Sequence, residues 1–237
     1  MQMYTMGGQT PPPRWFFGQI VALLLAIALA FGVALAFLVG GTQSSQASVG
    51  RLFGYTEKRS ANIKPFIKWT GTLDRYFKER TLEDKPCSSG LFNKCHLKDW
   101  KRFLNEVKGA DKMTQLERVN DYMNRAPYIV DPVNYGVPDY WATPQQFFVK
   151  DGDCEDYAIA KYLSLRALGW PTDKMRIVVL MDNNLRIPHA VLVVYHEGKT
   201  LVLDNQIRQV VTDNRIRHYR PIYSINEHAW WLHRSRG

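Results

Sequence analysis

The chain has 237 residues, of which 31 are Lys or Arg and 22 are Asp or Glu, so its formal net charge is +9. The hydrophobic fraction of 46% and the charged fraction of 22% are those of a folded protein and exclude disordered and collagen-like chains. Residues 20–39 form an unbroken run without a charged side chain. The remainder, about 190 residues, is enough for one well-buried globular unit.

The N-terminal part of the chain indicates export. A single positive charge, Arg14, precedes the apolar run, and a stretch of small and polar residues follows it. The Ser45-Gln46-Ala47 triplet places small residues where a signal peptidase would cut, after Ala47. The run is also long enough to span a bilayer. We therefore expect residues 1–47 to be a signal peptide or a membrane anchor, with residues 15–39 in the membrane if uncleaved, and residues 48–237 to be one exported domain.

The positive net charge has little bearing on function. A nucleic-acid-binding surface combines a stripe of basic residues with interleaved aromatic residues, and the sequence has no such stripe. An exported protein also rarely meets nucleic acid. We expect a solvated basic surface, the alternative being a patch for an acidic protein or an anionic membrane, and no nucleic-acid partner.

Apolar spacing predicts three helices. The spacing of Trp100, Phe103, Leu104 and Val107 predicts a helix over 98–108, and a similar pattern predicts a second over 113–123. Residues 127–144 hold four prolines and read as a long aromatic loop, of a kind that is commonly functional. A third helix, after Gly152 and up to Gly169, is apolar on most sides and is expected to be buried.

The pattern then changes to short β-branched segments. Residues 176–181, 189–195 and 200–204 are predicted strands, a short strand near 207–212 is expected to follow, and Glu197-Gly198-Lys199 suits a hairpin turn. Helices followed by strands indicate an α+β fold, with the buried helix packed on an antiparallel sheet.

Three cysteines leave one without an obvious partner. Cys87 and Cys95 flank a flexible Ser88-Ser89-Gly90 segment, so they form either a disulfide or two reduced thiols. Cys154 lies at the start of the buried helix, where free N–H groups and the helix dipole favour a thiolate. Cys154 is therefore a candidate nucleophile.

A nucleophilic cysteine needs a base and a group that orients that base. His189 begins a predicted strand and Asp204 ends the next one. If the turn between the strands has two or four residues, these side chains lie on the same face as diagonal neighbours. A three-residue turn would place them on opposite faces.

Acidic residues crowd the candidate nucleophile. Asp153, Glu155 and Asp156 would raise the pKa of the Cys154 thiol and oppose catalysis if nothing compensated them. A bound Ca²⁺ would remove that penalty, because it prefers carboxylate oxygens. The alternative is structural, since Asp153 and Asp156 also have the spacing of a helix capping box. The spacing is not that of an EF-hand, so further ligands must come from elsewhere, such as carbonyl groups of residues 127–144.

The segment 152–158, Gly-Asp-Cys-Glu-Asp-Tyr-Ala, together with Trp141-Ala142-Thr143-Pro144, resembles the bacterial transglutaminase-like cysteine peptidases. Within them it is most similar to the LapG-type periplasmic proteases, over roughly residues 65–225. The resemblance implies a papain-like or transglutaminase-like core. It also implies a Cys-His-Asp triad at Cys154, His189 and Asp204, and calcium ligands among Asp153, Glu155 and Asp156.

The same resemblance implies a biological setting. The expected protein is a periplasmic, calcium-dependent protease that cuts the N-terminal region of a large surface adhesin, which releases the adhesin and promotes biofilm dispersal. The expected regulator is an inner-membrane cyclic-di-GMP receptor whose periplasmic domain sequesters the protease. Two alternatives keep other functions open: a transglutaminase or amidase that uses the same acyl-enzyme, and a catalytically silent calcium-binding module.

Overall fold

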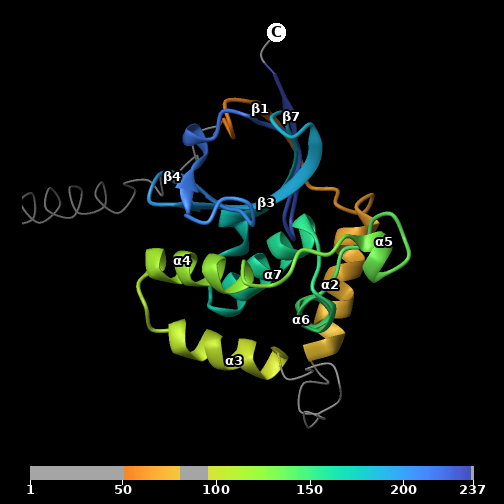
Figure 1. Cartoon of the computed structure of the whole chain (residues 1–237). Coiled ribbons are helices and arrows are strands. Elements are labelled where there is room, and N and C mark those ends of the chain that lie inside the picture. The colour runs from red at the N-terminus through yellow and green to blue at the C-terminus, as the bar shows by residue number, and fades with distance from the viewer. Residues whose placement is uncertain (1–50, 81–95, 236–237) are drawn as a thin grey trace, which may run out of the picture. The chain divides into compact units, whose positions relative to one another are not determined.

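Seven antiparallel strands form one curved sheet, and the helices pack on one side of it (Figure 1). The computed structural model describes residues 51–80 and 96–235. The order of the strands across the sheet is β1-β7-β6-β2-β3-β4-β5. Their bounds are β1 Thr56–Ser60, β2 Met175–Asp182, β3 Ile187–His196, β4 Lys199–Leu203, β5 Val211–Thr212, β6 Tyr219–Ile225 and β7 Trp230–Arg234.

The helices of the described residues precede the main strands in the chain. They are α2 Ile67–Arg80, α3 His96–Val107, α4 Lys112–Met123, α5 Asp131–Asn134, α6 Pro144–Lys150 and α7 Cys154–Ala167. The three helices predicted from apolar spacing are α3, α4 and α7. In α7 the side chains of Ile159, Tyr162 and Leu163 are fully buried, which confirms that this helix is central. The α+β class is confirmed.

Several elements differ from the sequence-based expectation. Residues 51–71 contain the edge strand β1, which was not predicted, and the start of the long helix α2. The expected loop of 127–144 contains the short helix α5, and α6 begins at its last residue. Strands β6 and β7 were not predicted.

Both faces of the central strands are covered, so these strands are apolar on both sides. Ile177 and Leu192 pack with α7 and the other helices in the main hydrophobic core. Val178 and Val191, the neighbouring residues on each strand, pack in a second cluster on the opposite face. The curvature of the sheet wraps around this second cluster (Figure 1). The central strand β3 is therefore held rigidly from both sides.

The hairpin between β3 and β4 has a two-residue turn. His196 pairs with Lys199, and Glu197 and Gly198 have φ angles of 48° and 72°. Two successive positive φ angles are typical of the tight turns that suit the twist of a hairpin. The pairing extends to Leu192 with Leu203 and fulfils the condition under which the side chains at positions 189 and 204 share a face.

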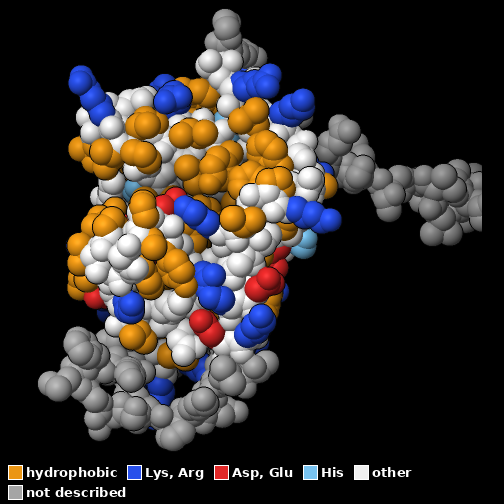
Figure 2. Space-filling view, turned by 90° about the vertical axis from the view of Figure 1, so that its right-hand side faces the viewer, with side chains coloured by type: hydrophobic (Ala, Val, Ile, Leu, Met, Phe, Trp, Pro, Cys, Tyr) orange, Lys and Arg blue, Asp and Glu red, His pale blue; other side chains and the backbone are white. Residues whose placement is uncertain are grey.

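Several predictions lie outside the described residues: the signal peptide or anchor over 1–47 and the Cys87–Cys95 pairing. Among the described residues, no helix is long and apolar enough to cross a membrane. On the face shown in Figure 2, basic side chains are scattered among hydrophobic and acidic ones.

Candidate functional site

Cys154 is the first residue of α7, and a tight turn places it there. Asp151, with φ of 61°, ends α6, and Gly152 follows it. A Cβ atom on Gly152 would lie 2.3 Å from Oδ2 of Asp156, so only glycine allows this approach. The turn therefore seats the thiol at the N-terminus of a buried helix.

His189 and Asp204 form a buried pair across the β3–β4 hairpin. Nε2 of His189 lies 2.9 Å from Oδ1 of Asp204, and both residues are almost fully buried. Asp204 also accepts hydrogen bonds from the Tyr219 hydroxyl (2.6 Å) and from the backbone N–H of Gln206 (2.9 Å). Burial alone would raise the pKa of Asp204, but these hydrogen bonds, led by that of His189, outweigh it and hold the pKa below its usual range.

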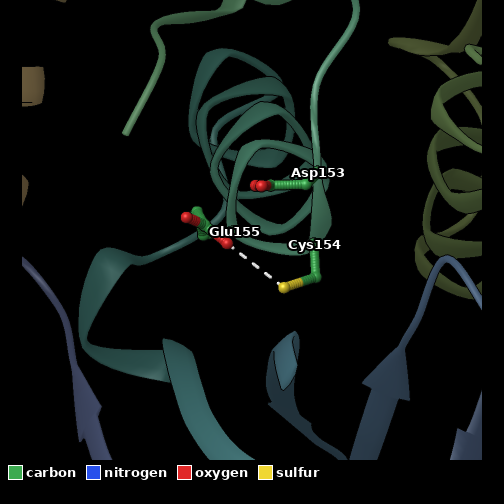
Figure 3. Close-up of side chains that lie close together, drawn as sticks. All are labelled: Asp153, Cys154 and Glu155. Carbon is green, nitrogen blue, oxygen red and sulfur yellow. Dashed lines mark hydrogen bonds between the residues drawn. The ribbon is translucent and has the colours of Figure 1, made fainter. Parts of the chain in front are cut away.

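The thiol of Cys154 lies beside the strand that carries His189. The backbone N–H of Ala190, the residue after His189, lies near the thiol and acts to lower its pKa. Among the described residues, no hydrogen bond joins Cys154 to His189. Instead, Sγ of Cys154 lies 3.1 Å from Oε2 of Glu155 (Figure 3).

The electrostatics around the thiol oppose its ionisation. Burial is the largest cause and the charge of Glu155 the next, and together with Asp153 they raise the pKa of the Cys154 thiol far above its usual value. Burial and the charge of Asp153 likewise raise the pKa of Glu155. The benefit expected from the helix dipole is therefore outweighed, as the crowding of acids predicts.

The aromatic loop of 127–144 folds back onto the nucleophile turn. Tyr128 forms a parallel bridge with Gly152, and the backbone N–H of Ile129 donates to Gly152 O at 2.9 Å. The Tyr128 ring stacks on Tyr157, and its hydroxyl lies near the Cys154 side chain. Tyr128 is half exposed, so it lies at the surface beside the nucleophile turn.

Potential metal ligands gather in three groups, and within each group the ligand atoms lie within 4.8 Å of one another. Two of the groups combine acids of the loop with acids beside the thiol. The groups are Asp153–Cys154–Glu155, Asp131–Asp139–Glu155 and Asp131–Asp153–Asp156. The three predicted ligands, Asp153, Glu155 and Asp156, do not form one group by themselves. Asp131 links them, because it belongs to both groups that include a loop acid.

The individual carboxylates differ in whether their oxygens have hydrogen-bond partners within the protein. Asp156 accepts hydrogen bonds from the backbone N–H groups of Ala142 (2.7 Å) and Asp153 (3.4 Å), as the capping-box alternative expected. By contrast, Oδ1 of Asp131 and Oδ1 of Asp153 are buried without a hydrogen-bond partner. A buried carboxylate oxygen without a partner is costly unless it is protonated or binds a cation. The donor set therefore fits a hard divalent cation at the Asp131–Asp153–Asp156 group, where Asp131 and Asp153 offer the oxygens without a partner and Asp156 also braces the turn.

Sequence reasoning did not assign Asp131, Asp139 or Tyr128 to the site. It expected backbone carbonyl groups of the loop as further metal ligands, whereas in the structure the loop places two carboxylates next to the acids beside the thiol. The signal that was available is a pair of acids inside a proline-rich loop that was already marked as functional.

Comparisons with known proteins identify the family of the chain. The profile of the family described as bacterial transglutaminase-like cysteine proteinase matches residues 87–233. The structure of Legionella pneumophila LapG is similar at 31% identity and a TM-score of 0.56, over 68% of this chain and 87% of that chain. The calcium-bound form of that protein gives a TM-score of 0.57 at 31% identity, over 70% of this chain and 90% of that one. Among curated proteins, none matches the chain.

Proposed function

Because the chain belongs to the bacterial transglutaminase-like cysteine proteinases, we propose that it is a calcium-dependent periplasmic endopeptidase that cuts the N-terminal region of a large surface adhesin. The observation that carries the proposal is the placement of Cys154 at the N-terminus of α7, beside β3, with the buried His189–Asp204 pair on the same hairpin. A cysteine protease requires this combination of nucleophile, base and orienting group.

In the proposed reaction, Asp204 accepts a hydrogen bond from Nε2–H of His189. This fixes the tautomer in which Nδ1 carries the lone pair of the base, and in this structure Nε2 of Gln206 lies 3.5 Å from that atom. Nδ1 takes the proton of Cys154, the sulfur attacks the backbone carbonyl, and the protonated imidazole gives its proton to the leaving amine. Water then hydrolyses the acyl-enzyme.

The negative charge on the attacked carbonyl oxygen needs hydrogen-bond donors. The Cys154 backbone N–H at the start of α7 is one candidate. The Tyr128 hydroxyl, which already contacts the Cys154 side chain, is the second. These two donors approach the thiol from different segments, α7 and the aromatic loop.

The calcium requirement is supported by the carboxylates around the thiol. Asp131, Asp153 and Asp156 would hold the ion, since their ligand atoms lie together and two of them have buried oxygens without a partner, and Glu155 lies in the two adjoining groups. Calcium, when bound, supplies positive charge that offsets these carboxylates. Without it, Glu155 accepts the hydrogen bond of the thiol and raises its pKa, which keeps the nucleophile protonated.

The substrate, the compartment and the regulator rest on the family resemblance of the segment 152–158. We infer release of the adhesin and biofilm dispersal as the outcome, in the periplasm, with residues 1–47 as signal or tether. The inferred regulator is the periplasmic domain of an inner-membrane cyclic-di-GMP receptor.

The test is incubation of the full-length chain with the N-terminal region of a large adhesin, with calcium or with EGTA, followed by sequencing of the new N-terminus. We expect one cut in the presence of calcium and none with EGTA or with Cys154→Ala. Cleavage that survives Cys154→Ala would refute the protease assignment. Incorporation of a labelled amine into a glutamine substrate without peptide cleavage would replace it with transglutaminase activity.

A further inference from the structure

The two partners of the proposed proton transfer are each in contact with another side chain. Sγ of Cys154 lies 3.1 Å from Oε2 of Glu155. Nδ1 of His189 lies 3.5 Å from Nε2 of Gln206, while Nε2 of the same ring bonds to Asp204. Gln206 is therefore a residue beside the base to which the proposed mechanism gives no role.

The contact between Gln206 and His189 involves the lone pair that the base needs. Because Nε2–H of the ring donates to Asp204, Nδ1 has no proton and can only accept. The Nε2 atom of Gln206 carries two N–H donors, so the amide faces Nδ1 as a donor. That nitrogen has a single lone pair, and the amide of Gln206 therefore competes with the thiol of Cys154 for it.

The backbone of Gln206 is anchored to the same pair. Its N–H donates to Oδ1 of Asp204 at 2.9 Å, and this oxygen also lies 2.9 Å from Nε2 of His189. The backbone two residues earlier is held by α4, since Nδ2 of Asn124 donates to Asp204 O at 2.8 Å. Gln206 itself is exposed. A change of rotamer, which takes picoseconds to nanoseconds in an exposed side chain, is thus enough to remove the amide from the base.

We propose that Gln206 is a positioning residue that caps the base: its side-chain amide occupies the lone pair of His189 in the free protein, and its withdrawal lets that nitrogen take the proton of Cys154. A bound peptide offers backbone carbonyl groups as alternative acceptors for the same amide. The inference rests on the proposed function, because it assumes that His189 activates Cys154. Gln206 acts through His189, the ring that its amide contacts.

The test measures the reactivity of the nucleophile and needs no protein substrate. Cys154 in the full-length chain, with saturating calcium at neutral pH, is alkylated by iodoacetamide, and mass spectrometry separates its peptide from those of Cys87 and Cys95. We expect Gln206→Ala to be alkylated roughly threefold faster than the parent, because one competing hydrogen bond is lost. Gln209→Ala, which removes an exposed glutamine of the same segment, is the matched control and should leave the rate unchanged.

Further measurements separate the hydrogen bond from the steric cover that the side chain gives. Gln206→Glu keeps the shape of the side chain and replaces the donor by a carboxylate, which favours a protonated imidazole, so it should be alkylated at least as fast as Gln206→Ala. If Gln206 acts through the base, Gln206→Ala has no effect in a His189→Gln background. With isotope-labelled histidine, the NMR resonance of His189 Nδ1 should move in Gln206→Ala and stay in place in Gln209→Ala, because it reports the hydrogen bond that this nitrogen accepts.

The outcomes distinguish this inference from the proposed function. The capping role would be overturned if either Gln206 variant were alkylated at the parent rate, or if Gln206→Ala were accelerated as much in the His189→Gln background as in the parent. Should His189→Gln alone leave the alkylation rate unchanged, it is the proposed activation of Cys154 by His189 that fails.

Discussion

The imidazole of His189 donates from Nε2 to Oδ1 of Asp204 across 2.9 Å, and Oδ2 of the same carboxylate receives the hydroxyl of Tyr219 at 2.6 Å. The carboxylate is thus fixed at both oxygens and cannot rotate without losing a bond. An orienting carboxylate held in this way keeps the imidazole in one tautomer.

Asp204→Asn should therefore abolish most of the activity without unfolding the protein. An amide in place of the carboxylate favours the wrong tautomer of His189, and we expect turnover to fall on the order of 10²–10⁴-fold. Peptidase assays and a thermal melt would measure both effects. Tyr219→Phe is the matched control: it keeps the charge and removes one bond, so its loss should be much smaller. Equal losses in the two variants would contradict this role of the charge.

Tyr128→Phe tests the second donor to the attacked carbonyl. The substitution removes only the hydroxyl, which lies near the Cys154 side chain. We expect kcat to fall roughly 10²-fold with little change in KM, because the bond is strongest in the transition state. Tyr157→Phe is the control, since it alters the stacked partner ring, whose hydroxyl binds Ala126 O instead. A change in KM alone would show that Tyr128 binds substrate and does not stabilise the transition state.

The acidic cluster should make the metal-free protein less stable as the pH rises. Burial raises the pKa of Asp156 from 3.8 to about 8, despite the hydrogen bonds it accepts, and the pKa values of Asp131, Asp153 and Glu155 are also raised. Raised carboxylate pKa values mean that the native state binds more protons than the unfolded state. Stability is then fully present below the unfolded pKa values, near pH 4, and is lost as the pH rises through the folded values, toward pH 8.

Thermal melts in EGTA between pH 5 and pH 8 would measure this loss. A change of about 1 kcal/mol corresponds to roughly 2–4 °C for a domain of this size. Calcium should raise the melting temperature most at pH 8, where the carboxylates are ionised. A calcium effect of equal size at pH 5 and pH 8 would argue against carboxylate ligands.

Asp131→Asn tests whether the aromatic loop contributes a ligand. Asp131 is fully buried, its Oδ2 accepts from the backbone N–H of Tyr140, and its Oδ1 has no partner. We expect calcium affinity, measured by calorimetry, to fall roughly tenfold or more because one charged ligand is lost. Asp121→Asn, an exposed acid paired with Arg125 on α4, should leave the affinity unchanged. Equal affinities in Asp131→Asn and the parent would place the ion elsewhere.

Local patterns were sufficient to predict the main helices and the hairpin. Apolar spacing places α3, α4 and α7 within two residues of their observed starts, because each helix buries one or more faces against the core. The hairpin register follows from Glu197 and Gly198, whose conformations permit a two-residue turn. The pairing of His189 with Asp204 is a consequence of that register.

The missed strands lack the usual alternation of apolar and polar residues. Strand β1 is a polar edge strand, Thr56–Ser60, and β6 contains Pro221 next to an irregularity in its pairing with β2. In β7 the buried positions are Trp231 and His233, so a histidine occupies a core position. These strands form because of tertiary packing, which a local sequence pattern does not reveal.

The missed site residues depend on a contact between distant segments. Asp131 precedes Asp153 by 22 residues, and the bridge of Tyr128 with Gly152 brings the two segments together. No periodicity in the sequence predicts a parallel bridge of this kind. The acids beside Cys154 were found because they are adjacent in the sequence, whereas those of the loop required the fold.

Gly152→Ala should disrupt the nucleophile turn itself. The added Cβ would lie 2.3 Å from Oδ2 and 2.7 Å from Cβ of Asp156, whose carboxylate is held by backbone N–H groups and cannot move freely. We expect a loss of about 1–3 kcal/mol in the free energy of unfolding, measured by urea denaturation, together with weaker calcium binding. Gly109→Ala, where an added Cβ meets open space, should change stability by no more than about 0.5 kcal/mol. If Gly152→Ala were as stable as Gly109→Ala, the turn would have space for a Cβ atom at position 152. The close packing of Asp156 against Gly152 would then be wrong.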